Sequence, residues 1–404
     1  MPDTVTAIET ILFGAFDRHN FGDLLFPHIA ARMLPGRHLR FAGLAAGDLT
    51  ACGGHHVEAI ATLAHAYPDQ PVDIVHVGGE LLTCNAWEAA VMLSSGKHAK
   101  SVIDQRSAWL WVPLEWADDR LRSPARAPYV LPRRYFAQTR TLAFNAVGGV
   151  DLQKCEPRLR AEVVETLRGA TDISVRDIVT QRALEANGVA ARLLPDPAVM
   201  VDELFGDLIR SQMSGEPVSS VRDACPNGYL AVQFSADFGD DRTLDEIAAQ
   251  LDAVASSEGL GIAFFRAGIA PWHDDLDVFE RTRQRMRTPS VHVMTSPNVW
   301  DICALIAGSS AYCGSSLHGR IVAAAFALPR VNIRHPALTR PDSKQTAFAA
   351  TWEHEDMPAD VGVAHIAQGV DAALRIERVR LERMATALAR TYKEGFAHLS
   401  ALLA

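Results

Sequence analysis

The sequence predicts an α/β protein with two Rossmann-like domains that face a cleft. Short apolar stretches with strand character alternate with helical stretches along most of the chain, and short loops join them. A stretch rich in Ser, Pro and Gly then divides this alternation into two parts of similar size. We therefore expect an N-terminal domain at 1–210, a linker at 211–228, a C-terminal domain at 229–363, and helices at 364–404 that could cross back to the first domain.

Composition limits the function classes. The 404 residues leave room for two or three domains, and a net charge of -9 argues against an electrostatic nucleic-acid binder. The Arg-rich stretch at 281–287 is interrupted by other residues, which favours a solvated face. The six cysteines are scattered without a C-x-x-C pair, which favours reduced thiols, and no residue cluster has convincing metal-ligand spacing. With no long apolar run, we expect a cytoplasmic protein with at most peripheral membrane contact.

The expected elements of the first half follow from short apolar runs and their Gly or Pro boundaries. Strands are expected at 8–13, 38–42, 71–77, 141–147 and 172–175, and helices at 24–34, 57–67, 157–168 and 178–187. The stretch 104–136 interrupts the pattern with prolines and with Trp109, Trp111 and Trp116. Aromatic packing under an irregular loop explains it, and so does a lid that stacks on sugar rings.

The second half repeats the alternation and ends in a compact βαβ unit at 308–334. Strands are expected at 229–234, 261–265, 291–293, 309–313 and 331–333, and helices at 244–256, 274–287, 298–307 and 318–328. The last of these helices is Ala-rich and apolar, so it should be buried, and Pro329 should stop it.

Two loops of the first half are candidates for ligand contact. The loop after the first strand carries Asp17, His19, Asn20, Gly22 and Asp23, at the edge where open α/β sheets place ligands. Asp23 is equally consistent with a helix cap. The third strand runs into Gly78-Gly79-Glu80, which makes Glu80 a candidate base, although ordinary turn chemistry also explains two glycines.

The turn inside the 308–334 unit is the third candidate. Ser315 and Ser316 can cap the helix, and its free amides and dipole favour an anion. His318 and Arg320 follow in the first turn, so the loop could seat a phosphate or carboxylate. The alternative is a capped core helix with a structural histidine.

An ordered set of short motifs resembles the polysaccharide pyruvyl transferase family over about residues 10–350. The motifs are Asn20-Phe21-Gly22-Asp23, Val77-Gly78-Gly79-Glu80-Leu81, Ser174-Val175-Arg176-Asp177, Leu194-Pro195-Asp196-Pro197 and Ser315-Ser316-Leu317-His318-Gly319, with Pro329 and Lys344 after them. The resemblance implies two Rossmann-like domains in the arrangement of GT-B glycosyltransferases, with 1–210 on the acceptor side and 229–363 on the donor side.

The resemblance also implies an enzyme that moves a pyruvyl group from phosphoenolpyruvate to two hydroxyls of a sugar, glycan or glycolipid, forming a ketal. Phosphoenolpyruvate would be a co-substrate and no cofactor would be needed. In this family the motif histidine, here His318, serves in donor binding and catalysis. Arg176 would hold the donor carboxylate or phosphate, with Arg320 and Lys344 as further cations.

The remaining motif residues complete the expected site. Asp23 or Glu80 would take the proton of the attacking hydroxyl. Ser315, Ser316 and Gly319 would contact the donor, while Asp177 and Asp196 would line the cleft.

One position departs from the family pattern. Many members carry arginine two residues before the motif histidine, where this chain has Ser316. A serine cannot form a bidentate ion pair, so the donor site must recruit another cation, such as Arg320, or bind a different donor. A nucleotide-sugar glycosyltransferase and a catalytically inactive binding protein therefore remain alternatives on the same fold.

Overall fold

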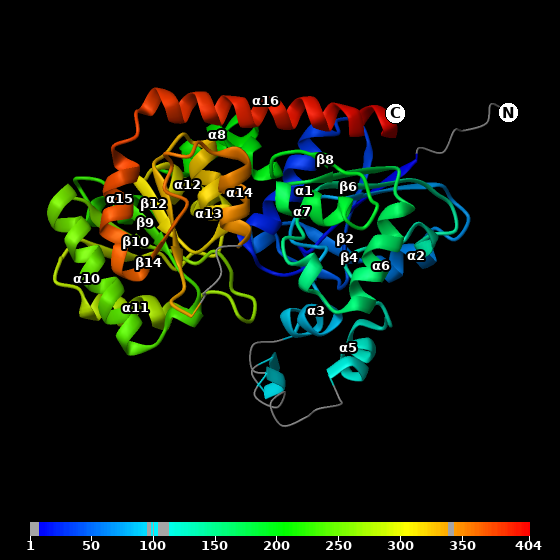
Figure 1. Ribbon diagram of the computed structural model, residues 1–404, viewed down its shortest axis with the longest axis horizontal. Helices are drawn as coiled ribbons and strands as arrows, with labels where there is room; N and C mark the ends of the chain where they lie inside the picture. The colour runs from blue at the N-terminus through cyan, green and yellow to red at the C-terminus, as the bar shows by residue number, and fades with distance from the viewer. Residues whose placement is uncertain (1–7, 95–97, 100, 104–112, 338–342) are drawn as a thin grey trace. The chain divides into compact units, whose positions relative to one another are not determined.

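The computed structural model describes residues 8–94, 98–99, 101–103, 113–337 and 343–404, which form two compact units (Figure 1). The first unit holds the described residues up to Arg18, then Phe26–Asp196 and Lys393–Ala404. The second holds His19–Leu25 and Pro197–Tyr392. Each unit has its own β-sheet with helices packed against it, so the predicted α/β architecture is confirmed.

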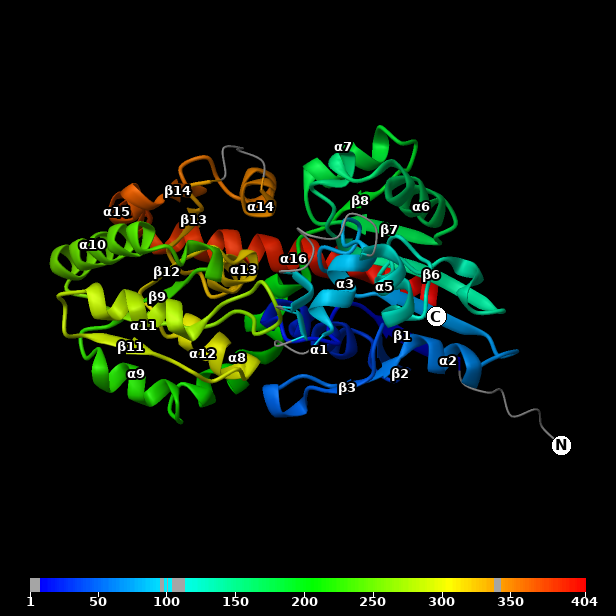
Figure 2. The same ribbon diagram turned by 90° about the horizontal axis from the view of Figure 1, so that it is seen from below.

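The first unit contains a sheet in the order β3-β4-β2-β1-β5-β6-β7-β8, parallel except for the pair β3 and β4. Its strands are β1 (Glu9–Phe13), β2 (His38–Gly43), β3 (Gly47–Asp48), β4 (His56–Ala59), β5 (Val72–His76), β6 (Thr139–Val147), β7 (Asp172–Val175) and β8 (Arg192–Leu193). Its helices are α1 (Phe21–Met33), which begins in the second unit, α2 (Ile60–Ala66), α3 (Ala86–Met92), α5 (Pro113–Leu121), α6 (Pro157–Arg168) and α7 (Ile178–Glu185). Figure 2 shows α6 and α7 beside the β7–β8 edge.

The second unit contains a fully parallel sheet in the order β11-β10-β9-β12-β13-β14. Its strands are β9 (Tyr229–Gln233), β10 (Gly261–Phe264), β11 (Val291–Val293), β12 (Ala311–Gly314), β13 (Arg330–Arg334) and β14 (Asp360–Gly362). Its helices are α8 (Val201–Gln212), α9 (Val218–Ala224), α10 (Asp241–Glu258), α11 (Leu276–Arg285), α12 (Val299–Ala307), α13 (Leu317–Ala325), α14 (Lys344–Trp352), α15 (Ile366–Leu374) and most of α16 (Arg378–Leu403). Figure 1 shows α10 and α15 on one face of this sheet and α12 and α13 on the other.

Each sheet has a point at which the strand order reverses. In the first sheet β1 lies between β2 and β5, and in the second β9 lies between β10 and β12. Successive strands are added on one side of the first strand and then on the other, so the loops after these strands diverge and leave a crevice. A ligand site is therefore expected beyond the carboxyl ends of β1 and β5, and of β9 and β12.

The expected linker at 211–228 contains the end of α8 and all of α9. The compact units divide earlier, between Asp196 and Pro197, rather than at residue 210. The reason is packing: α8 lies on α12, where the rings of Phe205 and Trp300 are 5.0 Å apart, so α8 belongs to the second unit. The expected helix at 57–67 also begins late, because 56–59 form strand β4, whose first two residues pair with β3 and whose last two pair with β2.

The C-terminal helix α16 ends in the first unit. Its last turns, Lys393–Ala404, cluster with that unit, where Arg192 donates to the carbonyl of Gly395 at 3.1 Å. A Cβ on Gly395 would lie 1.9 Å from a methyl carbon of Leu194. Only glycine permits this close approach, so Gly395 sets how closely the helix packs on Leu194.

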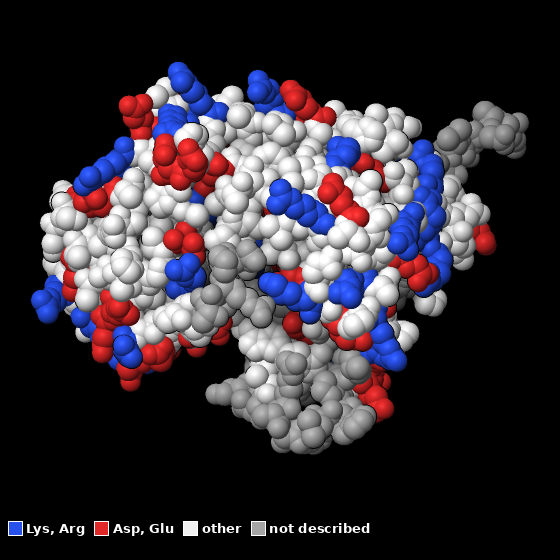
Figure 3. Space-filling view, in the orientation of Figure 1, with Lys and Arg blue, Asp and Glu red and all other residues white. Residues whose placement is uncertain are grey.

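The Arg-rich stretch at 281–287 is a solvated face. Arg281 and Arg285 both contact Asp241 of α10, at 2.7 and 2.6 Å, and Arg283 pairs with Glu280 within α11. Figure 3 shows acidic and basic side chains next to one another over α10 and α11. The charges on this face largely neutralise each other, so it offers no basic stripe to a polyanion.

Candidate active site

A pocket of about 360 Å³ opens at the carboxyl ends of the strands in the second unit, and every residue that lines it belongs to that unit. Its walls are the segments after β9, β10, β12 and β13, the start of α14, and Asn20. Because β9 and β12 are the strands at which the order reverses, the pocket lies at the topological switch point. Its volume suits a small metabolite or one sugar unit.

Two serines shape the start of α13 at this pocket. The amide of Ser315 donates to the carbonyl of Gln233 at 3.0 Å, and its Oγ accepts from the amide of Ser235 at 3.1 Å. Ser316 is the N-cap, and its Oγ accepts from the amide of Gly319 at 3.2 Å. The serines therefore hold the first turn of α13 against β9, and the positive end of the helix dipole faces the pocket.

His318 lines the pocket from this first turn and is 7% exposed. Its ring packs edge-on against Phe21, with centroids 6.3 Å apart. A Cβ on Gly22 would lie 2.0 Å from both Cγ and Nδ1 of His318. The first and last family motifs therefore meet, and glycine at position 22 makes room for the imidazole.

The 19–22 loop is fastened to the second unit by hydrogen bonds. His19 Nε2 lies 2.6 Å from the carbonyl of Pro297, and its Nδ1 accepts from the amide of Ile269 at 3.3 Å. Burial is the main cause that lowers the pKa of His19, so a neutral imidazole fits these partners. Asn20 lines the pocket and contacts His273 at 3.3 Å. His19 thus anchors the loop, whereas Asn20 reaches the site.

Asp23 was expected in the site but does not line the pocket. It is 6% exposed and stands in the first turn of α1, where a carboxylate is favourable to the helix dipole. Asp23 therefore lies inside the first turn of α1, after the N-cap position and away from the pocket wall.

Asp274 is a pocket residue that the sequence did not single out. Its Oδ1 accepts from Gln233 Nε2 at 2.8 Å, and its Oδ2 accepts from the amide of Ala267 at 2.6 Å. Burial raises the pKa of Asp274 to about 7, and these hydrogen bonds oppose the shift only in part. A carboxyl group with such a pKa can accept or give a proton near neutrality. In the sequence it was only one acid in the exposed-looking run 273–275.

Two cationic side chains, Lys344 and Arg334, line the pocket from the α14 and β13 side. Lys344 is the first residue of α14, whose N-cap Ser343 forms a capping box. Gln345 Nε2 donates to the carbonyl of Ser315 at 2.5 Å, which joins the start of α14 to the start of α13. Arg334 pairs with Asp360 at 3.1 Å. Two helix N-termini and Lys344 therefore act on the same space, which favours an anion.

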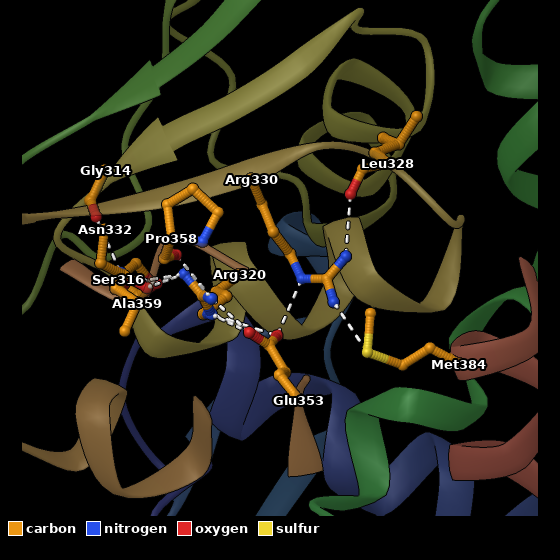
Figure 4. Close-up of polar contacts among 10 residues, drawn as sticks. All are labelled: Gly314, Ser316, Arg320, Leu328, Arg330, Asn332, Glu353, Pro358, Ala359 and Met384. Atoms are coloured by element: carbon orange, nitrogen blue, oxygen red, sulfur yellow. Dashed lines mark hydrogen bonds and ion pairs between the residues drawn. The ribbon is translucent and has the colours of Figure 1, made fainter. Parts of the chain in front are cut away.

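Arg320, which was expected as a further cation for the donor, does not line the pocket. Its guanidinium is fully buried and bonds Glu353, the carbonyls of Pro358 and Ala359 at 2.9 Å, and Asn332 Oδ1 at 3.1 Å (Figure 4). All three nitrogens of the guanidinium are thus in use inside the protein. Arg320 cannot replace the arginine that Ser316 lacks.

Glu353 lies between two buried guanidinium groups, those of Arg320 and Arg330 (Figure 4). Its Oε1 accepts from Arg330 Nε at 2.9 Å. Burial opposes the carboxylate, but the charges of Arg330 and Arg320 outweigh it and lower the pKa of Glu353 to about 2. Asn332 extends the cluster to the pocket wall, because its Nδ2 donates to the carbonyl of Gly314 at 2.8 Å. The cluster holds α13, β13 and the end of α14 in fixed positions relative to one another.

The other three family motifs converge in the first unit. Arg176 Nη2 contacts Glu80 Oε2 at 2.6 Å and Nη1 contacts Asp196 Oδ2 at 3.1 Å, while its guanidinium is 2% exposed. Burial opposes the charge of Arg176, but Glu80, Asp196 and Asp177 outweigh it and raise its pKa. A Cβ on Gly148 would lie 2.4 Å from Glu80 and 2.7 Å from Arg176. In this structure Arg176 bonds carboxylates rather than offering a surface to the donor.

The neighbours of this cluster have structural roles. Asp177 caps α7, accepting from the amide of Thr180 at 2.7 Å, and burial raises its pKa. Gly78 and Gly79 have φ of 124° and 97°, conformations that favour glycine, so they are more than an ordinary turn. The side chain of Glu80 keeps 27% exposure beside its contact with Arg176. Of the three ion-paired side chains Arg176, Asp196 and Glu80, Glu80 is therefore the one that solvent can reach.

A sequence model of the family described as "Polysaccharide pyruvyl transferase" matches residues 55–335, more than half of the chain. The chain belongs to this family. A search of curated protein sequences finds no significant match.

Solved structures resemble this family member in fold. UDP-GlcNAc 2-epimerase of Methanocaldococcus jannaschii, in complex with UDP-GlcNAc and UDP, is 10% identical and covers 95% of this chain and 99% of its own, with a TM-score of 0.52. The S. aureus MnaA-UDP co-structure is 10% identical and covers 96% and 92%, with a TM-score of 0.53. At such identity the likeness shows the fold alone, which is GT-B-like.

The Trp-rich stretch of this family member is only partly described. Trp109 and Trp111 lie outside the described residues. Trp116 packs against the cluster of Trp87 and Ala117, which supports aromatic packing for this tryptophan. Within the described ranges, no group of three or more His, Cys, Asp or Glu residues could hold a metal ion, and no helix has the length and apolarity to cross a bilayer.

Proposed function

We propose that this chain transfers a pyruvyl group from phosphoenolpyruvate to two hydroxyls of a sugar in a glycan or glycan precursor, forming a ketal. The observation that carries the proposal is the second-unit pocket, where His318, Lys344 and Asp274 meet. An anion site, an imidazole and a carboxyl group of near-neutral pKa are the groups that this reaction needs. Family membership supports the reaction class.

The donor would bind on the side of the pocket formed by α13 and α14. Lys344 and Arg334 line that side, and both helices present their N-termini there. The phosphate and carboxylate of phosphoenolpyruvate are both anionic, so this side matches them in charge. Lys344, in place of the buried Arg320, compensates for the serine at position 316.

The protons of the reaction can be assigned to pocket residues. Protonated His318 gives a proton to the methylene carbon of the donor, which becomes the methyl group, while C2 becomes electrophilic. Asp274 takes the proton of the first attacking hydroxyl. The C2–O bond to phosphate then breaks with its electron pair, and the second hydroxyl closes the ketal as its proton leaves with the phosphate. The proton taken by Asp274 then passes to His318 and replaces the one given to the methyl group, while the proton of the second hydroxyl leaves on inorganic phosphate, which is the other product.

A thermal-shift titration tests the donor. Phosphoenolpyruvate should raise the melting temperature of the wild type, because a ligand that binds only the native state stabilises it. The shift should vanish in His318→Ala and persist in His365→Ala, which removes an exposed histidine outside the pocket. Equal shifts in all three proteins would remove His318 from the donor site.

UDP-sugars and GDP-sugars, titrated in the same way, test the competing function. A response to these compounds and none to phosphoenolpyruvate would favour a nucleotide-sugar glycosyltransferase. Release of phosphate from phosphoenolpyruvate in the presence of an acceptor glycan, lost in His318→Ala, would establish the transfer itself.

A further inference from the structure

Trp272 is an exposed aromatic side chain at the pocket. It lines the pocket and keeps 39% of its surface accessible. Among the described residues with large apolar side chains, it is the one aromatic that is exposed rather than buried or half-buried. An indole costs free energy in water, so an exposed indole beside a polar pocket calls for an explanation.

The loop that carries Trp272 is held firmly on both sides of it. The amide of Asp274 donates to the carbonyl of Gly268 at 3.2 Å, and the amide of Ala236 donates to the carbonyl of His273 at 3.0 Å. The ring of His273 packs so closely on Gly268 that a Cβ there would lie 2.3 Å from it. The fixed neighbours give Trp272 a defined place rather than that of a loose loop tip.

Trp272 itself has φ of 65°, the left-handed region. A bulky residue rarely adopts this conformation, and where it does the surrounding structure imposes it. The backbone strain and the exposure of the indole both act against stability, yet the hydrogen bonds around Trp272 maintain them. Backbone strain together with exposure, both maintained by the surrounding structure, is typical of residues that contact a ligand.

The pocket has two chemically different sides. The segments after β12 and β13 and the start of α14 supply His318, Arg334 and Lys344, which suit an anion. The segments after β9 and β10 supply Trp272 together with two carboxyl groups, those of Asp237 and Asp274. In the strand order β10-β9-β12-β13, these two sets come from opposite ends.

We propose that Trp272 is the platform on which a pyranose ring of the acceptor stacks, with its hydroxyls directed to Asp237 and Asp274. One face of a pyranose carries C–H groups of partial positive charge, which match the negative face of an indole. The hydroxyls at the ring edge are donors that match carboxylate oxygens. This places the acceptor beside Asp274, the proposed base, and opposite the donor side; the assignment rests on the proposed function.

The test uses the full chain labelled with 5-fluorotryptophan and followed by fluorine NMR. Trp272→Phe identifies the Trp272 resonance by its loss. Methyl β-D-galactopyranoside, methyl β-D-glucopyranoside and methyl α-D-mannopyranoside are titrated to 100 mM, with glycerol as a polyol that has no ring face. A saturable shift of the Trp272 signal with at least one glycoside, and none with glycerol, supports the platform. No shift with any of the three overturns it.

A second measurement separates this inference from the proposed function. Trp272→Ala should keep the full thermal shift with phosphoenolpyruvate, because the indole is assigned to the acceptor side. Loss of that shift would place Trp272 on the donor side and overturn the inference. Ile269→Ala is the matched control, because Ile269 is 43% exposed on the same loop but does not line the pocket. If the wild type does not respond to phosphoenolpyruvate, the proposed function fails, whereas the glycoside titration still decides the role of Trp272.

Discussion

A methyl group at position 22 should displace the histidine of the pocket. The Cβ of Gly22→Ala would lie 2.0 Å from Cγ and Nδ1 of His318 and 2.6 Å from its Cβ, whereas ordinary contact begins at 3.4 Å. The imidazole must therefore move by about 1.4 Å or change rotamer. A misplacement of about 1 Å in an active site can lower the reaction rate roughly 100-fold, and we expect a loss of donor affinity of the same order. The inner part of the side chain is involved, so rotation of its tip cannot relieve the clash.

The shift in melting temperature with phosphoenolpyruvate measures how far the displaced imidazole weakens donor binding. At a concentration about 100 times the wild-type dissociation constant, bound ligand stabilises the native state by about 2.7 kcal/mol. A 100-fold weaker affinity would leave about 0.4 kcal/mol. Gly362→Ala is the matched control, because its Cβ would meet His365 Nδ1 at an unstrained 3.9 Å. If Gly22→Ala responds as Gly362→Ala does, the imidazole is not held in place by the glycine.

Three further predictions concern buried charges. Burial raises the pKa of Asp274 from 3.8 to about 7, so its contribution to stability is complete below pH 3.8 and is lost as pH rises through 7. The full loss is at most about 4 kcal/mol, of which about 3 kcal/mol falls between pH 5 and pH 8, and Asp274→Asn should abolish this difference in thermal unfolding at the two pH values. Glu353→Gln leaves two buried guanidinium groups without a carboxylate and should lower the free energy of unfolding by about 3–5 kcal/mol at pH 7. The wild type should itself lose this contribution as pH falls from 4.5 towards 2, because the carboxylate becomes protonated. Unchanged unfolding of the variant in urea would contradict this role of Glu353. Gly148→Ala should push Arg176 away from Glu80 and destabilise the first unit by about 1–3 kcal/mol. Hydrogen exchange of the amides in β6 and β7 measures this loss, and unchanged exchange would argue against the predicted clash.

The positions of most strands and helices followed from local pattern. β7 and β11 were predicted at 172–175 and 291–293 and are found at those residues. Apolar runs between Gly, Pro and capping residues determine such elements within a few positions, because burial and backbone geometry act locally. Strand β4 at 56–59 was missed, because it depends on pairing with β2 and β3, which its own residue pattern does not reveal.

The site was less accessible to sequence analysis. Arg320 and Lys344 are both cations that follow the motif histidine in the chain. Arg320 forms a buried ion pair with Glu353, more than thirty residues away, so of the two only Lys344 lines the pocket. Asp274 acquires its near-neutral pKa from burial, which a run of polar residues does not reveal. What the sequence did identify was the pair of motifs around Gly22 and His318, without showing that they meet.

The segment His19–Leu25 limits how the protein can be divided. It is flanked in the chain by residues of the first unit, yet it supplies Asn20 to the pocket of the second. A fragment cut at the boundary before Pro197 would therefore be an incomplete module, lacking the groups that seat the imidazole. A chimera that exchanges C-terminal halves between relatives would combine one parent's histidine with the other parent's loop. Recombination in this family should thus favour crossovers that carry this short N-terminal segment together with the distant half.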